Sequence, residues 1–206
     1  MAYTWDERSR QYYDERGKPI SQGEVRRRGL RVVNKSKAAL EELSNKLIAG
    51  DISHAEWVVG MREGVKATHS ATVQLAYGGK EQMGPVERGR LGVMIREQYK
   101  HLGAFALEVE SGAVEGEAIR ARASMYAGAA WGSHEASVRE REKDAGATEE
   151  RSFLEPEATH CQDCFDEAGK GWVPIDSLIP IGERTCLANC QCNMEFRAMS
   201  PGESEV

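Results

Sequence analysis

The sequence predicts a mainly α-helical fold, a helical bundle or an array of helical hairpins, followed by a small zinc-knuckle module that contains short β-strands. The helical part is predicted by four long segments in which apolar residues recur at helical spacing, with capping residues and glycines between them. The C-terminal module is predicted by five cysteines, all in the last quarter of the 206-residue chain. Aromatic residues make up only 7% of the chain, so the core must rely on aliphatic side chains.

Serine caps mark the first two helices. Ser21 and Glu24 have the spacing of a capping box and open a helix that is expected to run to about Ala49. A second box, formed by Ser53 and Glu56, opens a helix that a glycine pair ends. The connecting loop is so short that the two helices should pack antiparallel.

Two more helices complete the helical part. Pro85 suits the first turn of a third helix, which is expected to run to about Ser111. The fourth is expected from about Glu115 to Lys143, and its small residues at 127–130 would let a neighbouring backbone approach closely. Charges dominate residues 140–150, which we interpret as a frayed helix end or a linker. Each glycine inside a helix costs about 1 kcal/mol, so these helices should depend on tertiary or partner contacts.

These patterns divide the chain into four regions. Residues 1–20 are predicted to form an extended arm with weak helical character, which either docks on a partner or lies on its own domain. Residues 21–150 form the helical domain and residues 151–198 the zinc-binding module. Residues 199–206 are expected to be a flexible tail.

Composition argues against several classes of function. The formal net charge is −6, so the chain has no overall positive field that would attract nucleic acid. The densest basic cluster, Arg26 to Arg28 with Arg31, is interpreted as a solvated helix face. No segment approaches the ~20 apolar residues of a membrane span, and the N-terminus lacks the apolar core of a signal peptide. We therefore expect no membrane partner and a protein that stays in the cytosol where it is made.

The cysteines have the spacing of a metal site. Cys161 and Cys164 form a Cys-x-x-Cys pair, and Cys186, Cys190 and Cys192 follow after 21 intervening residues. Zinc binds four soft ligands in a tetrahedron, and clustered thiols in a reducing compartment favour metal over disulfides. We predict one structural zinc ion, with Cys161 and Cys164 as the surest ligands. Cys190 and Cys192 are the favoured second pair, and Cys186 can replace either of them.

Other interpretations of this segment have weaker support. His160 is set aside as a surface or outer residue, because it directly precedes Cys161 and would be an awkward ligand of the same ion. Free or disulfide-bonded thiols remain an alternative, whereas a redox Cys-x-x-Cys should follow a strand in a βαβ unit. A catalytic zinc would keep an open position, and this segment offers excess ligands. With no phosphate-binding loop, nucleophile elbow or His-Glu-x-x-His motif in the sequence, we predict that the protein is not an enzyme.

Short strands are expected around the cysteines. Residues 172–175 and 178–181 are β-like pieces that could form a hairpin and bring the two cysteine groups together. Cys192, Met194 and Phe196 alternate with polar residues, which is typical of a half-buried strand. Metal binding would supply folding energy that a segment of ~40 residues cannot obtain from burial alone.

The chain resembles the phage head-morphogenesis family of Mu F-like minor capsid proteins. The resemblance rests on a helical region followed by Cys161-Gln-Asp-Cys164 and then Cys190-Gln-Cys192, with Asn189 directly before the latter. It covers the last ~45 residues most specifically. The chain departs from the family where Leu187-Ala188 replaces the usual His-Pro pair and where Cys186 is additional.

This resemblance implies a minor structural protein of a tailed-bacteriophage virion that acts in head morphogenesis near the portal. Its implied partners are other virion proteins, such as the portal or the major capsid protein, and a homo-oligomer is left open. Its implied location is the virion, with the host cytoplasm during assembly. The alternative is a zinc-containing adaptor or regulator that binds protein or nucleic acid, which the acidic balance of the module disfavours.

Overall fold

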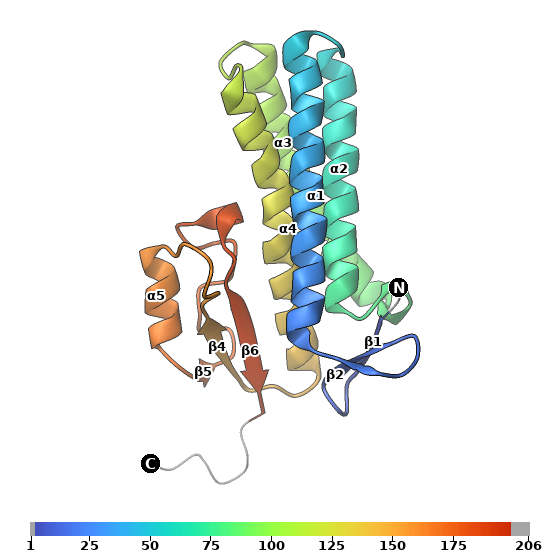
Figure 1. Cartoon of the computed structure of the whole chain (residues 1–206), viewed down its shortest axis with the longest axis vertical. Helices are drawn as coiled ribbons and strands as arrows, with labels where there is room; N and C mark the ends of the chain where they lie inside the picture. The colour runs from blue at the N-terminus through green and yellow to red at the C-terminus, as the bar shows by residue number, and fades with distance from the viewer. Residues whose placement is uncertain (1–2, 199–206) are drawn as a thin grey trace.

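The computed structural model describes residues 3–198 and confirms a mainly helical fold. Four long helices run along the longest dimension of the molecule, and a small β region with a short fifth helix lies beside α4 (Figure 1). Among the described residues, no helix has the length and apolar character that crossing a bilayer requires. The predicted tail, residues 199–206, lies outside the described part. The helices are α1 (Gln22–Ala49), α2 (His54–Ala76), α3 (Pro85–Glu110), α4 (Glu117–Asp144) and α5 (Gln162–Gly169), with 3-10 turns η1 (Lys80–Gln82) and η2 (Leu187–Asn189).

Both predicted helix caps are present. The Ser21 hydroxyl accepts a hydrogen bond from the Glu24 backbone N–H at 3.2 Å. At the start of α2, Ser53 and Glu56 each satisfy a backbone N–H of the other. Gly50 ends α1 with a φ of 77°, a conformation that glycine adopts without strain. The short turn that follows makes α1 and α2 antiparallel neighbours, as predicted.

The core of the bundle lies where α1, α2 and α4 meet, and α3 packs mainly on α2. Trp57 is fully buried there and contacts the Phe105 ring edge-on, with ring centroids 5.4 Å apart. At Gly60 and Gly64 a Cβ atom would lie within 2.7 Å and 2.6 Å of leucine side chains of α1. At these two positions glycine lets α1 pack closely against α2. As expected from the sequence, helix α2 therefore relies on tertiary contact where its glycines lower the helix propensity.

The N-terminal segment is a small sheet, and the prediction of weak helical character is wrong. Strands β1 (Tyr3–Asp6), β2 (Gln11–Asp14) and β3 (Pro19–Ile20) pair antiparallel in that order. Tyr3 and Trp5 of β1 and Tyr12 of β2 are buried and pack with Val25 of α1. Of the two open interpretations of the arm, the structure therefore supports a segment that lies on its own domain.

The charged residues around 140–150 are neither a frayed end nor a linker. Arg141 is buried in the last turn of α4, where it donates to the Tyr12 hydroxyl and lies over an aromatic ring of β1. Arg139 pairs with Glu150 at 2.8 Å, and both side chains are almost fully buried. Buried charges are tolerated when each has an ionic or hydrogen-bonding partner. The prediction failed because it equated high charge with exposure to solvent.

A second three-stranded sheet closes the described chain. Strands β4 (Glu149–Phe153), β5 (Val173–Pro174) and β6 (Asn193–Arg197) pair antiparallel in the order β5-β4-β6, so that β4 crosses the predicted boundary at residue 150. The strand predicted near residue 194 is β6. The predicted hairpin of residues 172–181 does not form, because β5 pairs with β4 instead and residues 178–181 are a loop that buries Leu178 and Ile181.

Candidate metal centre

Six soft donor atoms converge beside α4. Cys161 is the N-cap residue of α5, and Cys164 lies in the first turn of that helix. The other cysteines lie around η2 and lead into β6. The structure brings the five predicted cysteines together and adds one histidine; the donors are His160, Cys161, Cys164, Cys186, Cys190 and Cys192.

Three sulfur–sulfur distances, all measured from Cys164, are close to the edge of a tetrahedron around zinc. The Cys164 Sγ lies 3.5 Å from that of Cys161, 3.6 Å from that of Cys186 and 3.8 Å from that of Cys190. Four sulfurs that each lie ~2.3 Å from one zinc ion would be about 3.8 Å apart. A disulfide would require about 2.05 Å, and all five thiols are free. The cluster could therefore hold a metal ion such as zinc.

His160 lies within the cluster, which the sequence interpretation did not expect. Its Nε2 donates a hydrogen bond to the Glu155 carbonyl at 2.8 Å, because a carbonyl oxygen can only accept. Nδ1 is then the unprotonated nitrogen, and it lies 3.5 Å from the Cys192 Sγ. Histidines that bind metals usually donate their other N–H to a carbonyl or a carboxylate in this way. The adjacency to Cys161 is no obstacle, because the imidazole turns toward a thiol 32 residues away.

The ligand pairs expected from spacing describe only part of the cluster. Cys161 and Cys164 are neighbours, as predicted. Cys186, which was treated as a substitute, contacts Cys164 directly, and Cys192 groups with His160 and Cys164. None of the family models, curated proteins or solved structures compared with the chain matches it. The description of the site therefore rests on its own geometry.

Glycines on α4 allow the cysteine-rich loop to approach the helix backbone. A Cβ atom at Gly128 would lie 2.4 Å from the Ala188 carbonyl oxygen, and one at Gly132 would lie 2.8 Å from that of Ile181. Between these glycines, Trp131 donates from its indole N–H to the Cys192 carbonyl at 3.1 Å. The prediction that small residues at 127–130 admit a neighbouring backbone is confirmed.

Two arginines place positive charge next to the thiols. Arg184 is fully buried, donates to the Ser152 hydroxyl at 2.9 Å and hydrogen-bonds the Cys164 thiol. Arg26 of α1 pairs with Glu155 and lies close enough to Cys190 and Cys192 to interact electrostatically with them. The interpretation of Arg26 as part of a solvated face is therefore wrong. Both arginine cations favour the thiolate forms that bind metal. The spacing of apolar residues in the sequence does not distinguish either arginine from one on the surface.

The thiols influence one another's ionisation. Hydrogen bonding from Cys192 lowers the pKa of Cys190 to about 5, and the same interaction raises the pKa of Cys192. Burial raises the pKa of Cys186. Ionisation of Cys190 therefore opposes ionisation of the neighbouring Cys192. A divalent cation would shift the remaining thiols to the ionised form, because metal coordination strongly favours thiolate.

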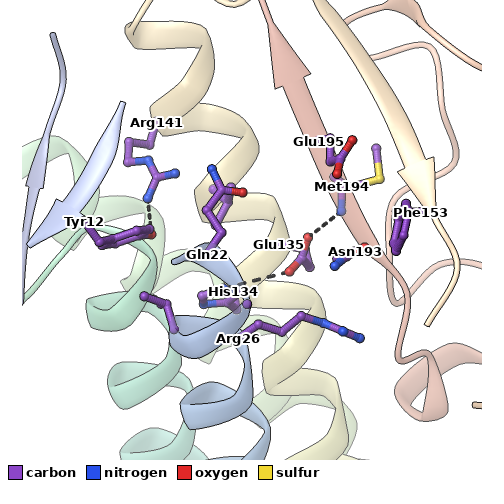
Figure 2. Close-up of a pocket in the computed structure, with 13 residues that line it drawn as sticks. Tyr12, Gln22, Arg26, His134, Glu135, Arg141, Phe153, Asn193, Met194 and Glu195 are labelled. Carbon is purple, nitrogen blue, oxygen red and sulfur yellow. Dashed lines mark hydrogen bonds and ion pairs between the residues drawn. The ribbon is translucent and has the colours of Figure 1, made fainter. Parts of the chain in front are cut away.

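A pocket between α1, α4 and β6 lies where the module meets the bundle. The buried carboxyl of Glu135 lines it. Glu135 accepts a hydrogen bond from the Met194 backbone N–H at 3.1 Å and lies 3.9 Å from the His134 imidazole (Figure 2). Burial raises the pKa of Glu135 to about 8 and lowers that of His134 to about 4. His134 Nδ1 donates to the Thr72 carbonyl at 2.9 Å, so this histidine has a structural partner within the bundle.

Proposed function

We propose that the chain is a non-enzymatic structural protein whose C-terminal module is held together by zinc. We further propose that it is a minor component of a tailed-bacteriophage virion and acts in head morphogenesis near the portal. The observation that carries the zinc assignment is the convergence of six soft donors, with sulfur atoms at tetrahedral spacing, from segments that are far apart in the sequence.

The burial of the donors favours a structural metal over a catalytic one. Cys164, Cys190 and Cys192 are 1%, 5% and 0% exposed, and they belong to the same apolar cluster as Trp131. A catalytic zinc needs a position that water or substrate can reach, whereas a structural zinc is closed by protein ligands. The carboxylate between the first two cysteines, Asp163, accepts hydrogen bonds from the backbone and hydroxyl of Thr185 at 2.7 and 2.6 Å, so it has a structural role.

A metal bound by these cysteines would link the segments of residues 161–192, which contain little regular secondary structure. Cysteine ligands come from α5, from the η2 turn and from the residue directly before β6. Short strands and one eight-residue helix bury little apolar surface by themselves. The free energy of zinc binding becomes folding free energy in such modules, because the unfolded chain has no preformed site.

Two observations support the assignment to a virion. The first is the resemblance to the head-morphogenesis family at Cys161 to Cys164 and at Asn189 to Cys192. The second is the surface of α3, where Val86, Val93 and Leu107 are 60%, 49% and 66% exposed. These positions are spaced by multiples of seven residues, so the three side chains lie on one face of α3, which we propose as the contact surface.

Co-sedimentation tests the virion assignment. We expect the chain to co-sediment with purified phage particles or with portal assemblies from the same source, at a low copy number relative to the major capsid protein. Absence from both fractions, with the protein folded and zinc-loaded, would overturn the virion assignment and leave the zinc assignment intact.

The alternative function, a zinc-containing adaptor or regulator that binds nucleic acid, has less support than the structural role. Of the basic residues in the module, Arg184 is buried, Arg197 pairs with Glu149 and Arg151 pairs with Glu195. Their charges are engaged within the module and are not available as a free basic surface. Binding to DNA that weakens steeply with salt would restore this alternative.

A further inference from the structure

The cluster has more donors than one ion uses. A tetrahedral zinc ion takes four ligands, and six donors meet here. Five of the six donors fall into two groups, within each of which all donor atoms lie within 4.8 Å of one another. One group contains Cys161, Cys164 and Cys186, and the other contains His160, Cys164 and Cys192. The two groups share only the Cys164 sulfur, so each offers a separate position for a cation.

Cys190 is the sixth donor and belongs to neither group, but it lies next to the sulfur that the two groups share. Its Sγ lies 3.8 Å from that of Cys164, which belongs to both. It also interacts with Cys186 of the first group and with Cys192 of the second. Cys164 therefore lies between the two positions, and Cys190 is the neighbouring sulfur that can join it there. When both sulfurs are counted in each group, each position has four ligands.

We propose that the cluster holds two zinc ions bridged by the Cys164 and Cys190 thiolates. Cys161 and Cys186 complete the first ion, and His160 and Cys192 complete the second. A thiolate has more than one lone pair, so one sulfur can bind two metal ions, and six-ligand modules that hold two zinc ions are known in other folds. This inference rests on the proposed zinc binding and extends it from one ion to two.

The charge of the surroundings fits this arrangement. Two dications and five thiolates leave one net negative charge, because the histidine is a neutral ligand. Arg184 hydrogen-bonds Cys164, which is one of the bridges. Arg26 interacts electrostatically with Cys190, the other bridge, and with Cys192. These cations compensate a buried anionic cluster that would otherwise be costly.

His160 is oriented as a ligand of the second ion. In a mononuclear site made of Cys161, Cys164, Cys190 and Cys192, the His160 imidazole would not be a ligand. In the structure its Nε2 donates to the Glu155 carbonyl, and its Nδ1 faces the Cys192 sulfur at 3.5 Å. An imidazole nitrogen at ~2.05 Å and a sulfur at ~2.3 Å from one zinc ion would be about 3.6 Å apart. The spacing therefore suits a shared ion.

The test is the metal stoichiometry of the full-length protein, measured by elemental analysis together with ¹¹³Cd NMR after cadmium exchange. We expect about two equivalents of metal and two cadmium resonances that show coupling through the bridging sulfurs. His160→Ala and Cys186→Ser should each lower the metal content about twofold, because each removes a ligand of a different ion. His101→Ala, which changes an exposed histidine on α3, should retain the full content.

The other outcomes separate this inference from the proposed function. About one equivalent of metal, unchanged by His160→Ala, would overturn the two-ion cluster and leave a structural zinc in place. Two equivalents without metal–metal coupling would overturn the bridged arrangement. No bound metal would overturn both proposals. Circular dichroism of each variant checks that a lower metal content does not simply reflect loss of the helical fold.

Discussion

Glu135 is the residue through which α4 holds the strand that follows the last cysteine. Its carboxyl accepts the Met194 backbone N–H, and the residue is only 5% exposed. Burial raises its pKa from 4.5 to about 8, although Arg26 and Arg141 act in the opposite direction and Cys190 raises it further. The folded state therefore holds a proton that the unfolded chain releases near pH 4.5. Its contribution to stability is lost as the pH rises from about 4.5 to about 8.

Glu135→Gln should remove this part of the pH dependence. The amide keeps the size of the side chain and an oxygen that can accept the Met194 N–H, but it cannot ionise. We expect the variant to exceed the parent in stability at pH 8 by roughly 1–3 kcal/mol, with a difference that shrinks toward pH 5. Urea unfolding at several pH values measures it. A difference that does not change with pH would show that the carboxyl does not titrate in this range.

Gly128 tests the contact between α4 and the cysteine-rich loop. A methyl group at this position would meet the Ala188 carbonyl oxygen, so Gly128→Ala should destabilise the protein by roughly 1–3 kcal/mol despite the better helix propensity of alanine. Gly103→Ala on α3 is the matched control, because nothing lies within 4 Å of its Cβ position. It should be neutral or stabilise by about 0.5–1 kcal/mol. Equal effects in thermal unfolding would contradict the close approach.

Among the elements, α5, the η2 turn and β6 share few contacts apart from the thiol cluster and the apolar residues around it. Trp131 and the loop containing Leu178 and Ile181 cover the cluster from the side of α4. The core around Trp57 is a separate apolar cluster farther along the bundle. Removal of metal should therefore affect the two ends of the molecule differently.

Chelation should expose the amides of the module before those of the bundle. After zinc removal we expect faster hydrogen exchange in residues 160–194, where the ligands lie. The amides of α2 around Trp57 should remain protected, because their packing does not involve the cluster. Exchange followed by mass spectrometry measures both regions in one sample. Unchanged exchange in the module would mean that the metal does not support its fold.

The elements that could be predicted from the sequence are those with local signals. Ser21, Ser53 and Gly50 act within one turn of the chain, so the helix ends were found to within one or two residues. β4 was missed because its charged residues are balanced by distant partners, as Glu150 is by Arg139. His160 was missed for the same reason, since its neighbour Cys192 is far along the chain. The alternation of Tyr3 and Trp5 was a usable strand signal that the interpretation as an arm overlooked.

For the whole molecule, the exposed apolar residues of α3 are where we expect partner contacts under the proposed virion role. Val93→Glu and Leu107→Glu should reduce co-sedimentation with phage particles at least tenfold, because a charge in an apolar interface is costly. Neither change should alter metal content or the unfolding temperature, since both side chains face solvent. Lys100→Glu, an exposed change on the same helix, serves as the charge control. Full co-sedimentation of the two apolar variants would place the contact elsewhere.

The metal content of the purified protein shows whether the cysteine-rich module is built around bound zinc. Cys164 belongs to both donor groups, so Cys164→Ser should remove bound metal and lower the unfolding temperature together. We expect zinc in the parent, its loss in this variant, and thiols that react with a thiol reagent only after chelation. The opposite result is a parent that contains no metal, has freely reactive thiols and unfolds at the same temperature as Cys164→Ser. That result would show that the module is not built around zinc.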